Sequence, residues 1–263
     1  MEDIFCLNIP IFRVPYKRWR KYGYLKADEK QNTKEVLCEA SDGYCMYCYS
    51  RIKVDKKLFG HLEHSIEKSN SDKLTECIPN IGIACSVCNQ SFKKIGEQKR
   101  KVSDVARKRF EEKSKCSSEK RKQCTVPCKS LRDLQVSYSE MPDAEIILQP
   151  MGIKGKQSGN PLAIQYDVLK MEFQPNIRQF AYSDDELMFI EKHILRFHLN
   201  DPKFRTRQLV DYIRNMIDNG GNVQRYEYNN MIVQLFVDKI KDKTVEEKVD
   251  ICSKIYVMLI TRL

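Results

Sequence analysis

The sequence predicts an α+β protein, with a small cysteine-rich unit in its N-terminal half and a mostly helical C-terminal region. Three observations predict this class. Paired cysteines at Cys45 and Cys48, and again at Cys85 and Cys88, indicate a compact metal-bound unit. Alternating apolar residues over 144–174 favour strands around a glycine-rich turn. Beyond that stretch, apolar residues recur at helical spacing.

The 263-residue chain is basic, and its charge is concentrated in one segment. It has 46 Lys and Arg residues against 36 Asp and Glu, a formal charge of +10. Residues 93–132 contain fifteen basic and five acidic residues, a surplus of ten that equals the whole formal charge. Such a segment is a candidate contact for a polyanion, and a solvated charged helix is the alternative.

No part of the sequence predicts membrane insertion or export. No run approaches the ~18 apolar residues of a membrane span, and the N-terminus lacks a signal-peptide pattern. We therefore expect a cytoplasmic protein with no membrane association.

Changes in composition divide the chain into four expected parts. These are an N-terminal arm and helix over 1–40, a metal-bound finger over 41–96, a basic helical extension over 97–140, and a region of strands and then helices over 141–263. Within them, helices are predicted over 28–41 and 97–123. The interleaved aromatic and basic residues of 16–22 could grip a nucleic acid or belong to a docked arm.

The cysteine spacing predicts a zinc site. The chain has eleven cysteines and no export signal, so a reducing compartment and metal binding are expected before disulfides. Two C-x2-C pairs, Cys45 with Cys48 and Cys85 with Cys88, can each occupy adjacent corners of a tetrahedron. Four thiolates leave no open coordination position, so this zinc would be structural. Four unrelated buried thiols are the alternative.

Three more cysteines, Cys116, Cys124 and Cys128, lie in the basic segment. A second zinc there would need Cys77 or a histidine as the fourth ligand. Reduced thiols are the default expectation.

Between the two cysteine pairs lies a Glu-His pair, followed by two asparagines. Glu63 and His64 precede Asn80 by 17 and 16 positions, and Asn89 follows Asn80 by nine. This order resembles that of the HNH nucleases, which carry their site on a β-hairpin followed by a helix, the ββα-metal finger. The resemblance covers roughly residues 45–95 and implies a zinc-knotted ββα finger in this chain.

More narrowly, the motifs resemble HNH nuclease subunits of bacterial anti-phage systems of the Septu and retron-associated types. The shared motifs are Leu62-Glu63-His64, the Lys-Ser that follows, and the second cysteine pair with its Asn. Two positions depart from that pattern. Glu67 replaces the usual proline, and Lys93 stands one position later than the lysine that often follows the last asparagine.

The resemblance implies a role for each residue. Glu63 and Asn89 would bind a catalytic Mg²⁺ or Mn²⁺, because carboxylate and amide oxygens suit hard cations. His64 would be the general base, since an imidazole titrates near ~6.5. Asn80 would hold the loop that carries the base. Adjacent strand residues point to opposite faces, so we expect the strand to end or bend at His64.

The basic segment begins four residues after Asn89, where a helix could continue from the metal as a track for phosphates. The residues expected to bind nucleic acid are Lys93, Lys94, Lys99, Arg100 and Lys101.

Two capping boxes, Ser183 with Glu186 and Thr244 with Glu247, predict helix starts in the C-terminal region. Apolar residues follow each box at helical spacing, and a helix is expected to end at Gly220-Gly221. An exposed stripe could bind an ATPase partner subunit, which the resemblance implies. The chain has no phosphate-binding glycine-rich loop of its own.

The expected function is a metal-dependent endonuclease acting on DNA, as the effector nuclease of a bacterial anti-phage system. Two alternatives stay open. One is a catalytically inactive zinc-finger adaptor for nucleic acid or protein, and the other is an RNase toxin that uses the same site. The reacting phosphodiester is common to DNA and RNA, so sequence motifs do not separate them.

Overall fold

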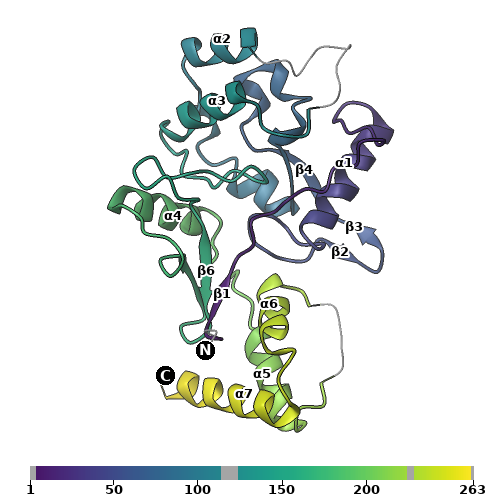
Figure 1. Ribbon diagram of the computed structural model, residues 1–263, viewed down its shortest axis with the longest axis vertical. Coiled ribbons are helices and arrows are strands. Elements are labelled where there is room, and N and C mark those ends of the chain that lie inside the picture. The colour runs from purple at the N-terminus through teal and green to yellow at the C-terminus, as the bar shows by residue number, and fades with distance from the viewer. Residues whose placement is uncertain (1–3, 114–123, 224–227, 262–263) are drawn as a thin grey trace.

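The computed structural model describes residues 4–113, 124–223 and 228–261 (Figure 1). It is an α+β fold, as the sequence predicts. Its α-helices are α1 Ala27–Ala40, α2 Asp104–Lys113, α3 Lys129–Ser139, α4 Asp184–Arg196, α5 Gln208–Asp218, α6 Met231–Ile240 and α7 Val245–Ile260. Its strands are β1 Cys6–Asn8, β2 Lys53–Val54, β3 Lys57–Leu58, β4 His61–His64, β5 Ile81–Ala84, β6 Ile164–Asp167 and β7 Glu172–Pro175.

Short helical turns lie between strands β4 and β5 and after β5. The 3-10 turns are Lys68–Asn70, Asp72–Leu74, Ile78–Asn80 and Glu97–Lys99, and a π-helical turn spans Cys88–Phe92. In Figure 1, α2 and α3 lie at one end of the molecule and α5, α6 and α7 at the other. Strand β4 lies between these ends.

Three small antiparallel sheets hold the chain together. The largest has the strand order β1-β6-β7, with Leu7 opposite Tyr166 and Tyr166 opposite Phe173. The N-terminal segment is therefore docked on a hairpin more than 150 residues away in sequence, in agreement with the docked-arm alternative. The other two sheets are the hairpins β2–β3 and β4–β5.

The strands predicted within 144–174 form, but not around the glycine-rich turn. Both strands follow that turn, and residues 168–171 close their hairpin instead. Gly152 and Gly159 have φ of +68°, which lets the backbone fold back on itself through a single bridge between Lys154 and Pro161. The stretch 144–148 is mostly buried but is not part of a sheet, and its Ile147 amide donates to His193 of α4.

The predicted helices are confirmed where the local sequence signals are strong. Residues 27–40 form α1, and both capping boxes form at the starts of α4 and α7. After α5, Gly220 and Gly221 have φ of +56° and +87°, as a helix stop requires.

The predicted basic helix over 97–123 is wrong for the part that the structure describes. Only α2, residues 104–113, is α-helical, and residues 114–123 lie outside the described residues. Gly96 has a φ of +73°, which changes the chain direction four residues after the π-helical turn ends at Phe92. Arg100 then turns into the interior, so no continuous helix runs from Asn89 into the basic segment.

One contiguous core joins the two halves. Tyr47 stacks on Phe197 with ring centroids 4.7 Å apart, and Tyr49 stacks on Phe173 at 5.5 Å. The Tyr49 carbonyl also accepts a hydrogen bond from the Met231 amide at 2.9 Å. The first cysteine pair is thus packed against β7, α4 and α6, which gives it a rigid support.

His193 of α4 is a core residue that is buried without charge. Its Nδ1 accepts a hydrogen bond from the Ile147 amide at 3.0 Å, while its buried Nε2 has no partner among the described residues. Burial lowers the pKa of His193 to about 3. Protonation of Nδ1 would also remove the acceptor for Ile147.

Lowering the pH from 7.5 to 5.5 should cost the protein stability through His193. Below its ordinary pKa the unfolded chain binds a proton that the folded chain excludes, so unfolding becomes more favourable as the pH falls. The expected loss is about 1.4 kcal/mol over this range. The measurement is urea unfolding at both pH values. A His193→Asn variant, which keeps an acceptor but does not titrate there, should lack this loss. Equal pH dependence in both proteins would contradict the prediction.

Candidate metal centre and active site

The four cysteines of the two C-x2-C pairs come together into one cluster. The sulfur atoms of Cys45, Cys48, Cys85 and Cys88 all lie within 4.8 Å of one another. Those of Cys48 and Cys85 are 3.7 Å apart, close to the ~3.8 Å that a tetrahedral site with Zn–S bonds of ~2.3 Å requires. The cluster could hold a structural metal ion such as zinc.

Among the described residues, Cys124 and Cys128 belong to no comparable cluster, and Cys116 lies outside those residues. Cys77 is buried elsewhere, next to the turn that ends at Asn80. The second zinc site considered from the sequence therefore gains no support from the described part of the chain.

The cysteine cluster positions the turn that follows β5. Cys85 directly follows the strand, and Cys88 begins the π-helical turn Cys88–Phe92. The Asn89 amide donates to the Cys85 carbonyl at 3.0 Å, and the Asn89 side chain is half-buried. The β4–β5 hairpin and this turn give the strand-strand-helix order, with a single helical turn in place of a regular α-helix.

His64 is the last residue of β4, so the strand ends where the sequence predicts. Its Nε2 lies 3.1 Å from the Thr75 carbonyl, and its ring meets that of Tyr24 edge-on at 4.5 Å. A carbonyl only accepts hydrogen bonds, so Nε2 carries the hydrogen and Nδ1 of the neutral ring has a free lone pair. Burial lowers the pKa of His64, which keeps the ring neutral and able to accept a proton at neutral pH.

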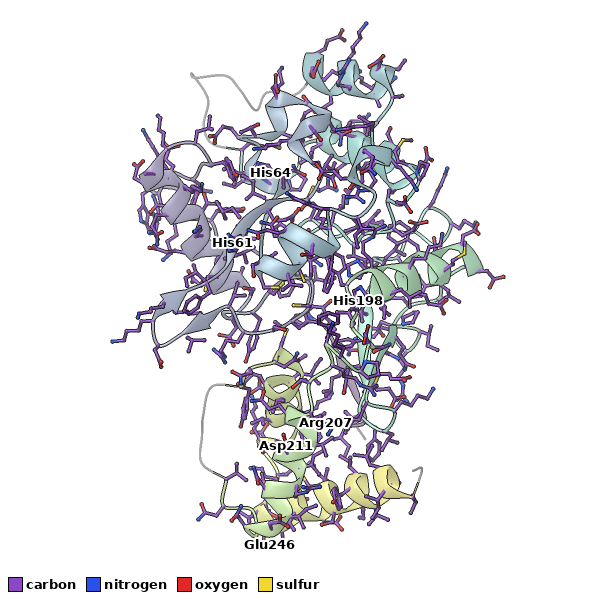
Figure 2. All side chains as sticks on the ribbon, turned by 180° about the vertical axis from the view of Figure 1, so that it is seen from behind. His61, His64, His198, Arg207, Asp211 and Glu246 are labelled. Atoms are coloured by element: carbon purple, nitrogen blue, oxygen red, sulfur yellow. The ribbon has the colours of Figure 1, made fainter. Side chains whose placement is uncertain are left out.

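His61 begins the same strand and is half-buried, as expected for a strand histidine outside the site. Figure 2 shows His61 and His64 in the same part of the molecule, well away from Arg207, Asp211 and Glu246 on the C-terminal helices.

Glu63 lies in the interior, paired with an internal cation. One carboxylate oxygen, Oε2, accepts a hydrogen bond from the Tyr47 hydroxyl at 2.6 Å. The other oxygen forms an ion pair with the Lys93 ammonium, which also donates to the carbonyls of His64 and Ser65. The Glu63 and Lys93 side chains are only 2% and 5% exposed. Glu63 and His64 therefore contact different parts of the chain, as strand alternation demands.

The oxygen atoms around the Lys93 ammonium show whether Mg²⁺ could bind at this position. Three oxygen atoms, from Glu63, His64 and Ser65, converge on one positive charge. Oxygen donors of this kind are those that hard divalent ions prefer. Glu63 thus offers the right chemistry for a divalent ion, and Asn89 lies on the turn that ends just before Lys93. The ammonium of Lys93 already occupies the Glu63 position.

Asn80 fixes the loop that follows His64. Its side-chain oxygen accepts from the Ile66 amide and its amide group donates to the Ile66 carbonyl, both at 2.9 Å. Its own carbonyl accepts from the Ser65 amide at 2.8 Å. Asn80 is completely buried, so these bonds form in a dry environment where they hold the loop firmly. Its part in catalysis stays a prediction.

A buried ion pair that sequence reasoning missed supports the far side of this loop. Arg100 donates to Glu67 Oε1 from Nε at 3.1 Å and from Nη2 at 2.8 Å, and the Tyr138 hydroxyl donates to the same oxygen at 2.9 Å. Arg100 also donates to the Ile95 carbonyl at 2.7 Å. Burial raises the pKa of Glu67, while Arg100 and Tyr138 oppose that rise. Glu67, which stands where the resemblance has proline, therefore links the loop to α3.

Two of the five residues expected to contact nucleic acid do not reach the surface. Lys93 is 4% exposed and Arg100 is fully buried, and each is bound to a carboxylate inside the protein. Their positive charges serve buried acids, which corrects their assignment as phosphate contacts. Lys94, Lys99 and Lys101 are exposed. Lys99 pairs with Asp143 at 3.1 Å, and Lys101 donates to the Ser69 hydroxyl.

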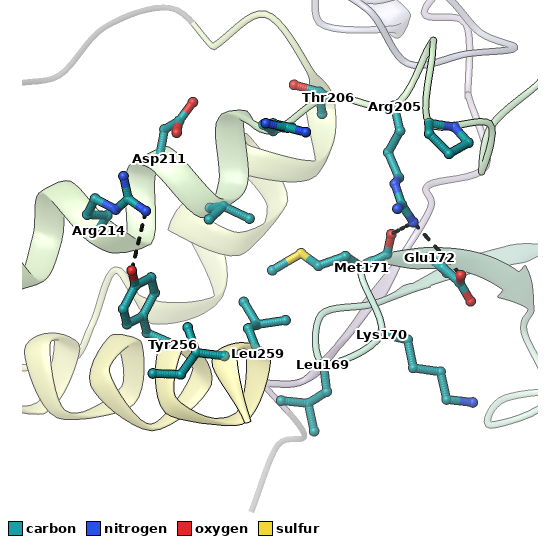
Figure 3. Close-up of a pocket in the computed structure, with 14 residues that line it drawn as sticks. Leu169, Lys170, Met171, Glu172, Arg205, Thr206, Asp211, Arg214, Tyr256 and Leu259 are labelled. Atoms are coloured by element: carbon teal, nitrogen blue, oxygen red, sulfur yellow. Dashed lines mark hydrogen bonds and ion pairs between the residues drawn. The ribbon is translucent and has the colours of Figure 1, made fainter. Parts of the chain in front are cut away.

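Cavities outside the Glu63–His64 site include two that border other parts of the fold. One of about 280 Å³ borders Cys48, Cys85 and Cys88 and is otherwise mainly aromatic and apolar. The other, of about 790 Å³, separates the tip of the β6–β7 hairpin from α5 and α7 (Figure 3). In this second cavity Arg205 bonds to the Met171 carbonyl at 3.0 Å, and Arg214 donates to the Tyr256 hydroxyl at 3.3 Å. Both guanidinium groups are therefore already partnered.

No protein-family model, no curated protein and no solved structure matches this chain. Along the described part of the sequence, no helix combines the length and apolar character that crossing a membrane demands.

Proposed function

We propose that the protein is a metal-dependent endonuclease of the HNH type. The observation that carries this proposal is the state of His64. It ends a hairpin strand, its Nε2 is held by the Thr75 carbonyl, and its Nδ1 is left as a base. The preceding residue, Glu63, is a buried carboxylate whose side chain lies on the other face of the strand. An adaptor would need a zinc-supported surface but no imidazole prepared in this way.

In the proposed reaction, His64 Nδ1 takes a proton from the attacking water. The Thr75 carbonyl keeps the ring oriented and stabilises the positive charge that forms on it, because it accepts the Nε2 hydrogen throughout. Asn80 holds the adjoining loop, so the base stays in place. Glu63 and Asn89 would hold the divalent ion, which when bound supplies counter-charge for the phosphate and the leaving oxygen.

Incubation with plasmid DNA and with total RNA tests the proposal. With Mg²⁺ or Mn²⁺ present, DNA should be cut, and EDTA should stop the reaction. A His64→Ala protein purified in parallel controls for contaminating nucleases. Cutting of RNA alone would favour the RNase toxin. Binding without cutting of either substrate would favour the adaptor and overturn the proposal.

We also propose that this nuclease is the effector of a bacterial anti-phage system and works beside an ATPase. The resemblance of residues 45–95 supports the first part. For the second, α7 packs on α5 and leaves Val257, Met258 and Ile260 about half exposed near its end. Exposed apolar side chains grouped on one helix are a common feature of partner surfaces.

Neutralising the exposed lysines beside the site should weaken nucleic-acid binding. In a Lys94→Gln/Lys99→Gln/Lys101→Gln variant, fewer counterions are released on binding. The log–log slope of affinity against salt should therefore flatten by up to ~2.7, from ~0.9 per lost phosphate contact. Filter-binding titrations at several salt concentrations measure it. Three exposed lysines at the opposite end, Lys241, Lys243 and Lys254, provide the matched control. If the slope of affinity against salt is the same in both variants, the basic segment is a solvated surface and not a nucleic-acid contact.

A further inference from the structure

Lys93 is the feature that neither the charge pattern nor the proposed reaction explains. A buried lysine is costly because its charge is removed from water, and it persists only when paired. Here the ammonium is enclosed by the Glu63 carboxylate and two backbone carbonyls, those of His64 and Ser65. Each of these oxygens belongs to the strand end that carries the proposed base.

We propose that Lys93 is an internal cation that occupies the Glu63 end of the metal site and must withdraw before a divalent ion binds there. This inference rests on the proposed function, because it concerns the same site. Lys93 is then a positioning residue: without metal it neutralises Glu63 and ties down the residues around His64.

The physical basis is competition for a single carboxylate. The second oxygen of Glu63 is held by the Tyr47 hydroxyl, so the Lys93 side is the one at which a cation can be exchanged. An ammonium and a divalent ion at one carboxylate would lie within a few ångströms and repel each other strongly in a poorly solvated site. The four-carbon lysine stem is flexible enough to move its charge away. An incoming phosphate would give the displaced ammonium another anion to bind.

The alternative is that Lys93 only holds the fold together. Both roles predict that its loss destabilises the protein, so stability alone does not separate them. They differ in what a divalent ion does to the variant. Under competition, removing the ammonium leaves a buried carboxylate that binds a cation more tightly. A purely structural lysine would leave metal affinity unchanged or lower.

Mn²⁺ binding in the absence of nucleic acid separates these roles, with free Mn²⁺ followed by electron paramagnetic resonance. Four proteins are compared: wild type, Lys93→Met, Lys93→Met/Glu63→Gln, and Lys156→Met. Lys156 is a surface lysine that pairs with Glu140 at 2.8 Å and controls for the loss of a lysine in an ion pair. Zinc content is measured in each protein, so that Mn²⁺ at the cysteine cluster is not counted.

We expect Lys93→Met to bind Mn²⁺ at least tenfold more tightly than wild type. The double variant should lose this gain, and Lys156→Met should match wild type. Equal or weaker binding by folded Lys93→Met overturns the inference. If Lys93→Met folds poorly, millimolar Mn²⁺ should restore the folded yield, because a protein is stabilised by an ion that binds only its folded form. Failure of Mn²⁺ to restore it overturns the inference as well.

These readouts do not depend on cleavage. Tighter Mn²⁺ binding by Lys93→Met in a protein that cuts neither DNA nor RNA would sink the proposed function and leave the inference standing. Cleavage by wild type together with unchanged Mn²⁺ affinity in Lys93→Met would sink the inference alone.

Discussion

Replacing His64 with alanine should lower the cleavage rate by ~10²–10⁴-fold, the usual cost of losing a general base. Nucleic-acid affinity should change little, because the side chain is buried against Tyr24 and Thr75 and adds no charge at neutral pH. The measurement is single-turnover cleavage of plasmid DNA at saturating protein. Unfolding by urea shows whether the variant has kept its fold.

The matched control for that experiment is His61→Ala. His61 lies on the same strand and is half-buried, but nothing in the proposed reaction uses it. Its replacement should leave the cleavage rate within a few-fold of wild type. If His64→Ala cuts as fast as wild type, His64 is not the base. If both variants lose activity equally, strand damage explains the loss better than chemistry.

The parts of the fold that the sequence predicts correctly depend on signals spanning a few residues. The C-x2-C pairs come together as their spacing predicts, because each short pair can place two thiolates at adjacent corners of one site. The capping boxes at Ser183 and Thr244 form because the cap and its partner are three residues apart. In the same way Gly220-Gly221 ends α5, since both residues adopt positive φ.

The site is predicted less completely, because its oppositely charged residues pair with partners that are far away in the sequence. Lys93 and Arg100 belong to a strongly basic segment. From composition alone, every lysine and arginine of that segment is expected to be exposed. Their partners, Glu63 and Glu67, lie some thirty residues upstream and become neighbours only when the hairpin and the turn pack together. The Tyr47 hydroxyl on Glu63 was missed for the same reason, since Tyr47 looks like a spacer inside a C-x2-C pair.

The docking of the N-terminus shows the same limit in the backbone. Strand β1 has only three residues and no distinctive alternation, so nothing local marks it as a strand. It pairs with the edge of β6 that β7 leaves open, and β6 lies more than 150 residues further along the chain. The bonds from Arg100 to Glu67 are also long-range, and the basic composition of 97–123 conceals them.

Replacing Cys88 with serine should have the largest effect on the fold. A structural zinc contributes about 10–16 kcal/mol of apparent binding free energy in zinc-finger peptides, comparable to the ~5–15 kcal/mol stability of a whole domain. Serine is a poor zinc ligand, so most of that energy should be lost. We expect wild type to contain one zinc per chain, and Cys88→Ser to contain little zinc and to be largely misfolded. Metal analysis and circular dichroism measure the two effects.

Cys252→Ala provides the matched control, because Cys252 is equally buried but lies on α7, away from the cluster. It should keep its zinc and its fold. The loss of zinc in Cys88→Ser should also disturb the active site. Cys88 begins the turn that carries Asn89, and Lys93, which pairs with Glu63, directly follows this turn. Without the cluster this turn has no anchor, and Glu63 is left buried without its cation. A Cys88→Ser protein that lacks zinc but folds and cuts like wild type would show that the four thiolates do not support the site.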